Sequence, residues 1–195
     1  YTLTANVVGS GSVGKNPDQT TYTSGQVVTL TATPQAGWSF SGWSGDLTGT
    51  TNPATITMSA NRTVTATFIQ NAYALTVNVT GSGSVGKSPD QASYAHGTIV
   101  TLTATPATGW SFSGWSGALT GTTNPATITM DAAKTVTATF TQNSYALTAN
   151  VVGSGTVGKN PNLSTYTHGT VVTLTATPAT GWSFSGWSGA LTGTT

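Results

Sequence analysis

The side chains best suited to bind a ligand in this 195-residue chain are its six Trp. They form three pairs, each within the sequence Gly-Trp-Ser-Phe-Ser-Gly-Trp, so that the two Trp of a pair are five residues apart. An odd spacing places them on opposite faces of an unbroken strand, which leaves one free to stack on a sugar ring. The alternative is that both pack inside a small core, as large aromatic side chains commonly do. The candidate glycan-stacking residues are Trp43, Trp115 and Trp187.

The chain has few side chains that could act as a general acid, a general base or a nucleophile. The chain has no Cys, which excludes a thiol nucleophile and a Cys-based metal site. Its only two His, His96 and His168, occupy one position of an internal repeat, and the first copy of that repeat has Ser24 there. A general base that a reaction requires should not be missing from one of three near-identical units. We therefore predict that the chain has no catalytic residues and is not an enzyme.

The carboxylates do not recur either. Asp18 and Asp90 correspond to Asn162 in the third copy, while Asp46 is replaced by Ala118 in the second. Calcium sites need several oxygen ligands, usually with clustered carboxylates. The sequence therefore predicts no metal site, and no pattern in it indicates a cofactor.

These residues belong to a repeat of 72 residues, of which the sequence contains two complete copies and one incomplete copy. The copies span residues 1–72, 73–144 and 145–195, and the first two are identical at 54 of their 72 positions. The third copy has no counterpart of residues 52–72. Self-similarity at a fixed period is typical of tandem repeat proteins. We predict three modules with these boundaries, the third one incomplete.

Within a copy, apolar residues alternate with Thr, which is the pattern of strands with one buried face. Residues 1–8 and 12–15 are expected to form a hairpin across a Gly-Ser-Gly turn, and residues 54–58 and 63–68 a second one. No segment carries a helical apolar stripe. The predicted fold class is all-β, a tandem array of small antiparallel β modules of about 72 residues. The expected core contains a Trp and the following residues: Tyr1, Leu3, Val7, Val28, Leu30, Phe40, Ile56, Val64 and Phe68.

Three motifs together resemble a known family: residues 37–43, residues 52–58 and residues 63–68, with their later copies. The chain is similar to the divergent internalin B-repeat modules of bacterial surface and secreted proteins. The resemblance implies a β-rich module, often in tandem, that acts as a stalk, spacer or adhesive segment outside the cell. The wider relatives have a β-grasp-like fold with a helix, and this sequence departs from them in showing no helical segment. The family has no catalytic residues to transfer.

Charge and hydropathy exclude several partners. Only 5% of the residues are charged and the net charge is +1, so there is no basic surface for nucleic acid. No apolar run approaches the length of a membrane-spanning helix. We predict a non-catalytic, extracellular tandem-repeat protein of bacteria that serves as a stalk, spacer, or fibre-forming or adhesive segment. The alternative is a carbohydrate-binding module that uses one exposed Trp per repeat, with polysaccharide as its partner.

The incomplete third copy adds an expectation about protein partners. Without counterparts of residues 54–58 and 63–68, it would expose strand edges, and such edges recruit further strands. The copy is then one part of a longer array, or poorly ordered, or completed by strands from another copy of the chain. A permuted division also stays open, with residues 52–123 and 124–195 as the whole units. The four-residue connectors 69–72 and 141–144 favour a rod with little freedom between modules.

Overall fold

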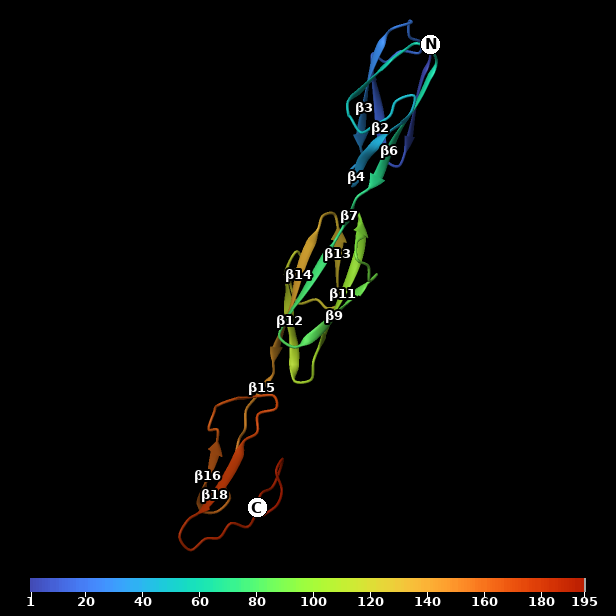
Figure 1. The fold of residues 1–195 in the computed structure, drawn as a ribbon. Helices are drawn as coiled ribbons and strands as arrows, with labels where there is room; N and C mark the ends of the chain where they lie inside the picture. The colour runs from blue at the N-terminus through green and yellow to red at the C-terminus, as the bar shows by residue number, and fades with distance from the viewer. Residues whose placement is uncertain (195) are drawn as a thin grey trace.

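The computed structural model describes residues 1–194, and these contain strands, turns and loops but no helix. The three sequence copies follow one another along a single direction, so that the chain has an elongated shape with its termini towards opposite ends (Figure 1). We refer to residues 1–72, 73–144 and 145–194 as modules 1, 2 and 3. The all-β prediction is confirmed.

Modules 1 and 2 have the same set of long strands. Those of module 1 are β1 (Leu3–Val8), β2 (Gly11–Asn16), β3 (Val27–Pro34), β4 (Trp38–Gly45), β5 (Ala54–Thr57) and β6 (Arg62–Gln70). Those of module 2 are β8 (Leu75–Thr80), β9 (Gly83–Ser88), β11 (Thr98–Pro106), β12 (Trp110–Gly117), β13 (Ala126–Met130) and β14 (Lys134–Gln142). The short strands β7 (Ala72–Tyr73) and β10 (Tyr94–Ala95) pair with each other. Module 3 contains β15 (Ser144–Tyr145), β16 (Gly155–Asn160), β17 (Tyr166–Thr167) and β18 (Thr173–Pro178).

Each complete module consists of two three-stranded sheets, with the orders β1-β6-β4 and β2-β3-β5 in module 1. Strand β1 runs parallel to β6, so the prediction of purely antiparallel modules is wrong at this pair. Both predicted hairpins are also wrong, because β2 pairs with β3 and β5 pairs with β3, while β6 lies between β1 and β4. The connections after β1 and after β5 each carry the chain from one sheet to the other. Alternation marks the buried face of a strand but does not identify its neighbour.

The core lies between the two sheets of each module. Six of the predicted core residues of module 1 are buried: Leu3, Val28, Leu30, Ile56, Val64 and Phe68. Phe40 is half-buried. Tyr1 and Val7 were expected in the core but are 44% and 41% exposed. Val7 is exposed because β1 is an edge strand whose burial decreases along its length, and Tyr1 precedes that strand. The prediction missed Tyr22 and Met58, which are 4% and 0% exposed.

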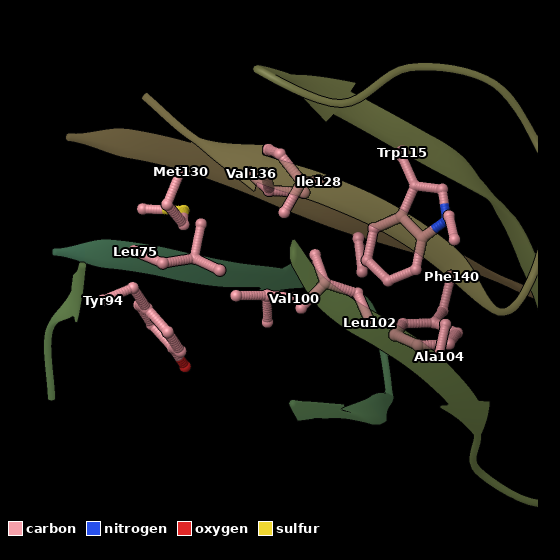
Figure 2. Close-up of a cluster of buried hydrophobic side chains, with 12 residues drawn as sticks. Leu75, Tyr94, Val100, Leu102, Ala104, Trp115, Ile128, Met130, Val136 and Phe140 are labelled. Carbon is pink, nitrogen blue, oxygen red and sulfur yellow. The ribbon is translucent and has the colours of Figure 1, made fainter. Parts of the chain in front are cut away.

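The core of module 2 repeats this arrangement (Figure 2). In module 1, residues from β1, β3, β4, β5 and β6 form one buried cluster that stays within residues 3–68. The cluster of module 2 stays within residues 75–140. Residues 52–70 therefore complete module 1 and do not belong to the following copy, which contradicts the permuted division.

An Asn side chain extends the ladder between β3 and β5 in module 1 and between β11 and β13 in module 2. In module 2, Nδ2 of Asn124 donates to the carbonyl oxygen of Ala104 at 2.7 Å, and the Ala104 N–H donates to Oδ1 of Asn124 at 2.9 Å. Asn52 and Ala32 form the same pair of bonds in module 1, at 2.7 and 2.8 Å. The amide thus satisfies a backbone donor and acceptor beyond the last residue pair of the sheet.

We predict that Asn124→Ala lowers the free energy of unfolding of module 2 by about 1–3 kcal/mol, because two partly buried backbone groups of Ala104 lose their partners. Amide hydrogen exchange of the full chain, resolved by module, measures this change. Asn124→Asp keeps one acceptor oxygen but places a second one against the Ala104 carbonyl oxygen, so it should not restore the stability, while the unaltered Asn52 of module 1 provides the internal control. Unchanged exchange in residues 98–130 would contradict the prediction.

Module 3 has only part of this architecture. Strand β16 pairs with β18, and β15 pairs with β17. Residues 147–152 and 182–186 match the sequences of β8 and of the start of β12, but they form no strands here. In module 2, β14 lies between β8 and β12 and bonds to both. Among residues 145–194 no segment corresponds to β14, so the two segments have no such strand to pair with in the described residues.

Candidate functional site at the module junctions

The structure places the candidate glycan-stacking residues differently from the prediction. Trp43 and Trp115 are each only 5% exposed, so the expectation of a solvent-facing indole at these positions is wrong. Nε1 of Trp115 donates to the carbonyl oxygen of Thr123 at 2.9 Å, and its ring lies 4.9 Å from that of Phe112. Trp187 is half-buried and lies 5.0 Å from Phe184.

A β-bulge explains why both Trp of a pair turn inward. The pairing of β4 with β6 shifts register between Phe40 and Gly42, where Gly42 has a φ of +157°. The extra residue reverses the alternation of side chains in the second half of the strand. Trp38 and Trp43 therefore both pack against the core of module 1 in spite of their odd spacing. The same shift occurs between Phe112 and Gly114 in module 2.

The two His lie where one module meets the next. The ring of His96 covers Gly37 of module 1 so closely that a Cβ atom at Gly37 would overlap it. The edge of the same ring meets the Tyr73 ring, with the centroids 6.1 Å apart. His96 immediately follows β10, and β10 pairs with β7. The His ring therefore belongs to an interface between modules and not to an exposed turn.

The connecting residue, Asn71, is bonded on both sides. Its N–H donates to the carbonyl oxygen of Gly37 at 2.8 Å, and its own carbonyl oxygen accepts the N–H of His96 at 2.8 Å. Its Oδ1 accepts a hydrogen bond from Oγ of Ser39 at 2.6 Å. Nε2 of Gln70 donates to the carbonyl oxygen of His96 at 3.2 Å. Asn71 is the single residue between the last strand of module 1 and β7, so the linker has almost no free length.

The second junction reproduces the first. The N–H of Asn143 donates to the carbonyl oxygen of Gly109 at 2.8 Å. The N–H of His168 donates to the carbonyl oxygen of Asn143, also at 2.8 Å. Ser111 and Gln142 repeat the two side-chain bonds, at 2.6 and 3.1 Å. We define the junction residues as these two sets: Gly37, Ser39, Gln70, Asn71, Tyr73 and His96, and Gly109, Ser111, Gln142, Asn143, Tyr145 and His168. Two matching sets show that the repeat sequence itself specifies this interface.

Sequence reasoning missed the junctions, although a signal was present. The position of His96 and His168 is Ser24 in module 1, and that variation was interpreted as evidence against a role. The signal was that both His recur at one repeat position, and in the structure each ring covers a Gly of the preceding module.

The four Asp of the described residues each form an ion pair at the surface. Lys15, Lys87 and Lys134 each pair with an Asp three residues away, and exposed pairs of this kind contribute little to stability. The N–H of Thr63 and then the guanidinium of Arg62, at 2.6 and 3.0 Å, hold the pKa of Asp46 below its usual value. The small stabilisation that ionised Asp46 gives through these bonds is therefore present above the usual pKa of Asp. It is lost as the pH falls through the lowered pKa of Asp46.

Residues 1–194 contain no group of three or more His, Cys, Asp or Glu that could hold a metal ion. Within the same residues there is no helix long and apolar enough to cross a membrane.

The comparison with protein families gives a match over all three copies. The model of the Divergent InlB B-repeat domain matches residues 1–72, 73–144 and 145–195. No curated protein and no solved structure matches the chain.

Proposed function

Because this chain belongs to the divergent InlB B-repeat family, we propose that it serves as a stiff stalk or spacer within an extracellular bacterial protein. Modules of this family typically occur in bacterial surface proteins and are generally structural and non-catalytic. A stalk needs modules that fold individually and junctions that hold neighbouring modules in one relative orientation. The separate cores support the first requirement, and the hydrogen-bonded junctions support the second.

The observation that carries the proposal is the one-residue linker, which is hydrogen-bonded to both modules at each junction. A flexible tether samples many directions, because none of its residues is fixed. Here, bending at Asn71 would break its bonds to Gly37 and His96 and separate the His96 ring from Gly37. Each such bond contributes about 0.5–1.5 kcal/mol, and the cost of bending includes several of them.

A stalk of this kind also accounts for the surface composition. Threonine alternates with the buried residues along the long strands, and only nine side chains carry a formal charge. Threonine favours strands and keeps their outer face hydrated without charge. Repeated copies can then lie near one another on a cell surface without strong mutual repulsion. Adhesion would depend on what such stalks present at the surface. Fibre formation would depend on how the stalks associate with one another.

The alternative function, carbohydrate binding through one exposed Trp per repeat, loses its structural basis. Trp43 and Trp115 are buried, and their partners Trp38 and Trp110 are half-buried against the cores. Among the Trp of the described residues, only Trp182 in module 3 is largely exposed, at 58%. The arrangement does not repeat a sugar-stacking platform from module to module.

A distance measurement tests the stalk. The chain has no Cys, so spin labels can be attached to Thr31→Cys in module 1 and Thr103→Cys in module 2, two exposed positions on equivalent strands. We predict a single narrow distance distribution between the labels by electron paramagnetic resonance. Scattering should give a radius of gyration of about 25–30 Å, against about 16 Å for a compact chain of this length. A broad distance distribution in the unaltered chain would contradict the proposal.

A further inference from the structure

Strands β2 and β9 lie at the edges of their sheets in the two complete modules. Strand β9 ends the order β13-β11-β9 and pairs with β11 alone among the described residues, and β2 has the same place beside β3. A Cβ atom added at Gly86, near the middle of β9, would meet no atom within 4 Å. At Gly14 of β2, the nearest atom would be the Thr31 carbonyl oxygen at 3.9 Å. A strand edge without bulky side chains is a template for a further strand.

The residue after Gly86 points inward although it carries a charge. Lys87 lies opposite Leu102 in the pairing of β9 with β11, and Leu102 is 0% exposed. Val85, on the same face of β9, packs against the core of module 2. The Lys87 side chain is 26% exposed, so most of its stem is covered while its ammonium reaches the surface. The alternation of the strand calls for an apolar residue here, so the charge needs a separate explanation.

Asp90 keeps the Lys87 ammonium at the rim of the module. Nζ of Lys87 lies 2.9 Å from Oδ1 of Asp90, whose side chain is 73% exposed. The hydrogen bond to Asp90 raises the pKa of Lys87 above its usual value, so Lys87 is charged at neutral pH. The side chain thus passes along the core face of β9 and ends in water beside the open edge.

Module 1 repeats this arrangement. Lys15 lies opposite Leu30, which is 0% exposed, and its Nζ is 3.1 Å from Oδ1 of Asp18. In the third copy of the repeat the acid is replaced by Asn162, whereas the Lys is kept as Lys159. The inward-pointing Lys, and not its ion pair, is therefore the feature that the three copies share.

We propose that these Lys prevent the open edges of β2 and β9 from pairing with the same edges of a second copy of the chain. Two identical strands can pair antiparallel about a two-fold axis, so each edge is its own potential partner. A strand added to β9 would lie across the path by which Lys87 reaches water. The ammonium would then be enclosed beside Leu102 and Val85, and enclosing a charge in apolar surroundings is unfavourable.

This protection matters for a chain with so little charge. A net charge of +1 gives almost no repulsion between copies, and proteins near zero net charge tend to associate. Copies that lie side by side then depend on local features of their strand edges to stay separate. The proposal is independent of the stalk function and would hold even if the junctions were flexible.

Sedimentation velocity of the full chain over a range of concentrations tests the proposal through Lys87→Met. Met is long and unbranched but uncharged, and we expect dimerisation at least about tenfold tighter than that of the unaltered chain. New amide protection in the dimer should be centred on residues 83–88. Lys87→Gln removes the charge without adding an apolar side chain and should act in the same direction, which covers the case of a Met variant that folds poorly.

Three control variants separate edge pairing from changes in net charge or in apolar surface. Lys87→Arg keeps the charge and should leave the chain monomeric. Lys87→Met combined with Thr20→Lys restores the net charge through an exposed loop of module 1, and this double variant should still dimerise. Thr103→Met adds an exposed apolar side chain to the central strand of the same sheet and should leave the chain monomeric.

Four results would overturn the proposal. Equal dimerisation of the Lys87→Met and Lys87→Arg variants would show that the charge does not protect the edge. Monomeric Lys87→Met and Lys87→Gln variants with a folded module 2 would show that the edge does not pair. A dimer of the unaltered chain with protection of residues 83–88 would show that Lys87 permits pairing. A Lys87→Met dimer that protects other residues would assign the association to another surface.

Discussion

Trp115→Ala is expected to remove about 3–5 kcal/mol from the free energy of unfolding of module 2, the usual cost of truncating a buried Trp. The indole is 5% exposed, contacts Phe112 and donates a hydrogen bond to Thr123 in the loop before β13. A module of about 72 residues has only about 4–11 kcal/mol of stability in total. The variant should therefore populate an unfolded module 2 while module 1 remains folded.

Amide hydrogen exchange read separately for residues 1–72 and 73–144 distinguishes these states. Trp115→Phe keeps an aromatic ring and loses only the Nε1 bond and part of the volume, so its effect should be smaller. Ser116→Ala, at an exposed position of the same strand, is the matched control and should leave exchange unchanged. Full protection of module 2 in Trp115→Ala would mean that this indole is not part of the core.

Insertion of Gly-Ser-Gly-Ser after Asn71 is expected to convert the first junction into a hinge. Four flexible residues span about 11 Å on average, enough to separate the His96 ring from Gly37 and to uncouple the backbone bonds across Asn71. With labels at Thr31→Cys and Thr103→Cys, the distance distribution should become several times wider. The stability of each module should change by less than about 0.5 kcal/mol, because no core residue is altered.

Two further variants show whether the junction contacts themselves fix the orientation of module 2 relative to module 1. His96→Ala removes the ring but keeps the backbone bonds, and we expect an intermediate width. The same four residues inserted after Thr20, in an exposed loop of module 1, should leave the distribution narrow. If the insertions after Asn71 and after Thr20 give the same width, the junction contacts do not orient the modules.

Much of the fold could be predicted from the sequence because alternation is a local property. The period of two identified Leu30 and Val64 as core residues without any knowledge of their neighbours. Pairing is not local: β1 finds its partner β6 at the opposite end of the module, and nothing in residues 3–8 specifies this choice. The Gly-Ser-Gly turn was interpreted as a hairpin, whereas it carries the chain between sheets.

The candidate site was harder to predict than the fold. One extra residue between Phe40 and Gly42 reverses the face of the later side chains in β4, so the spacing of Trp38 and Trp43 gave the wrong face for Trp43. The junction depends on residues from three separate segments, represented by Gly37, Asn71 and His96, which come together only after both modules have folded. Asn71 and His96 belong to no motif that was identified in the sequence, and Gly37 belongs to a motif that was interpreted through its two Trp.

The parallel pairing of β1 with β6 decides how a module responds to a pulling force. The chain enters the module at the start of β1 and leaves it at the end of β6, so tension draws these two neighbouring strands in opposite directions along their own axes. The six residue pairs between Leu3–Val8 and Arg62–Thr67 are then sheared together and cannot be opened one after another. Strands β8 and β14 have the same geometry in module 2. Each complete module is thus a mechanical clamp in series with the next.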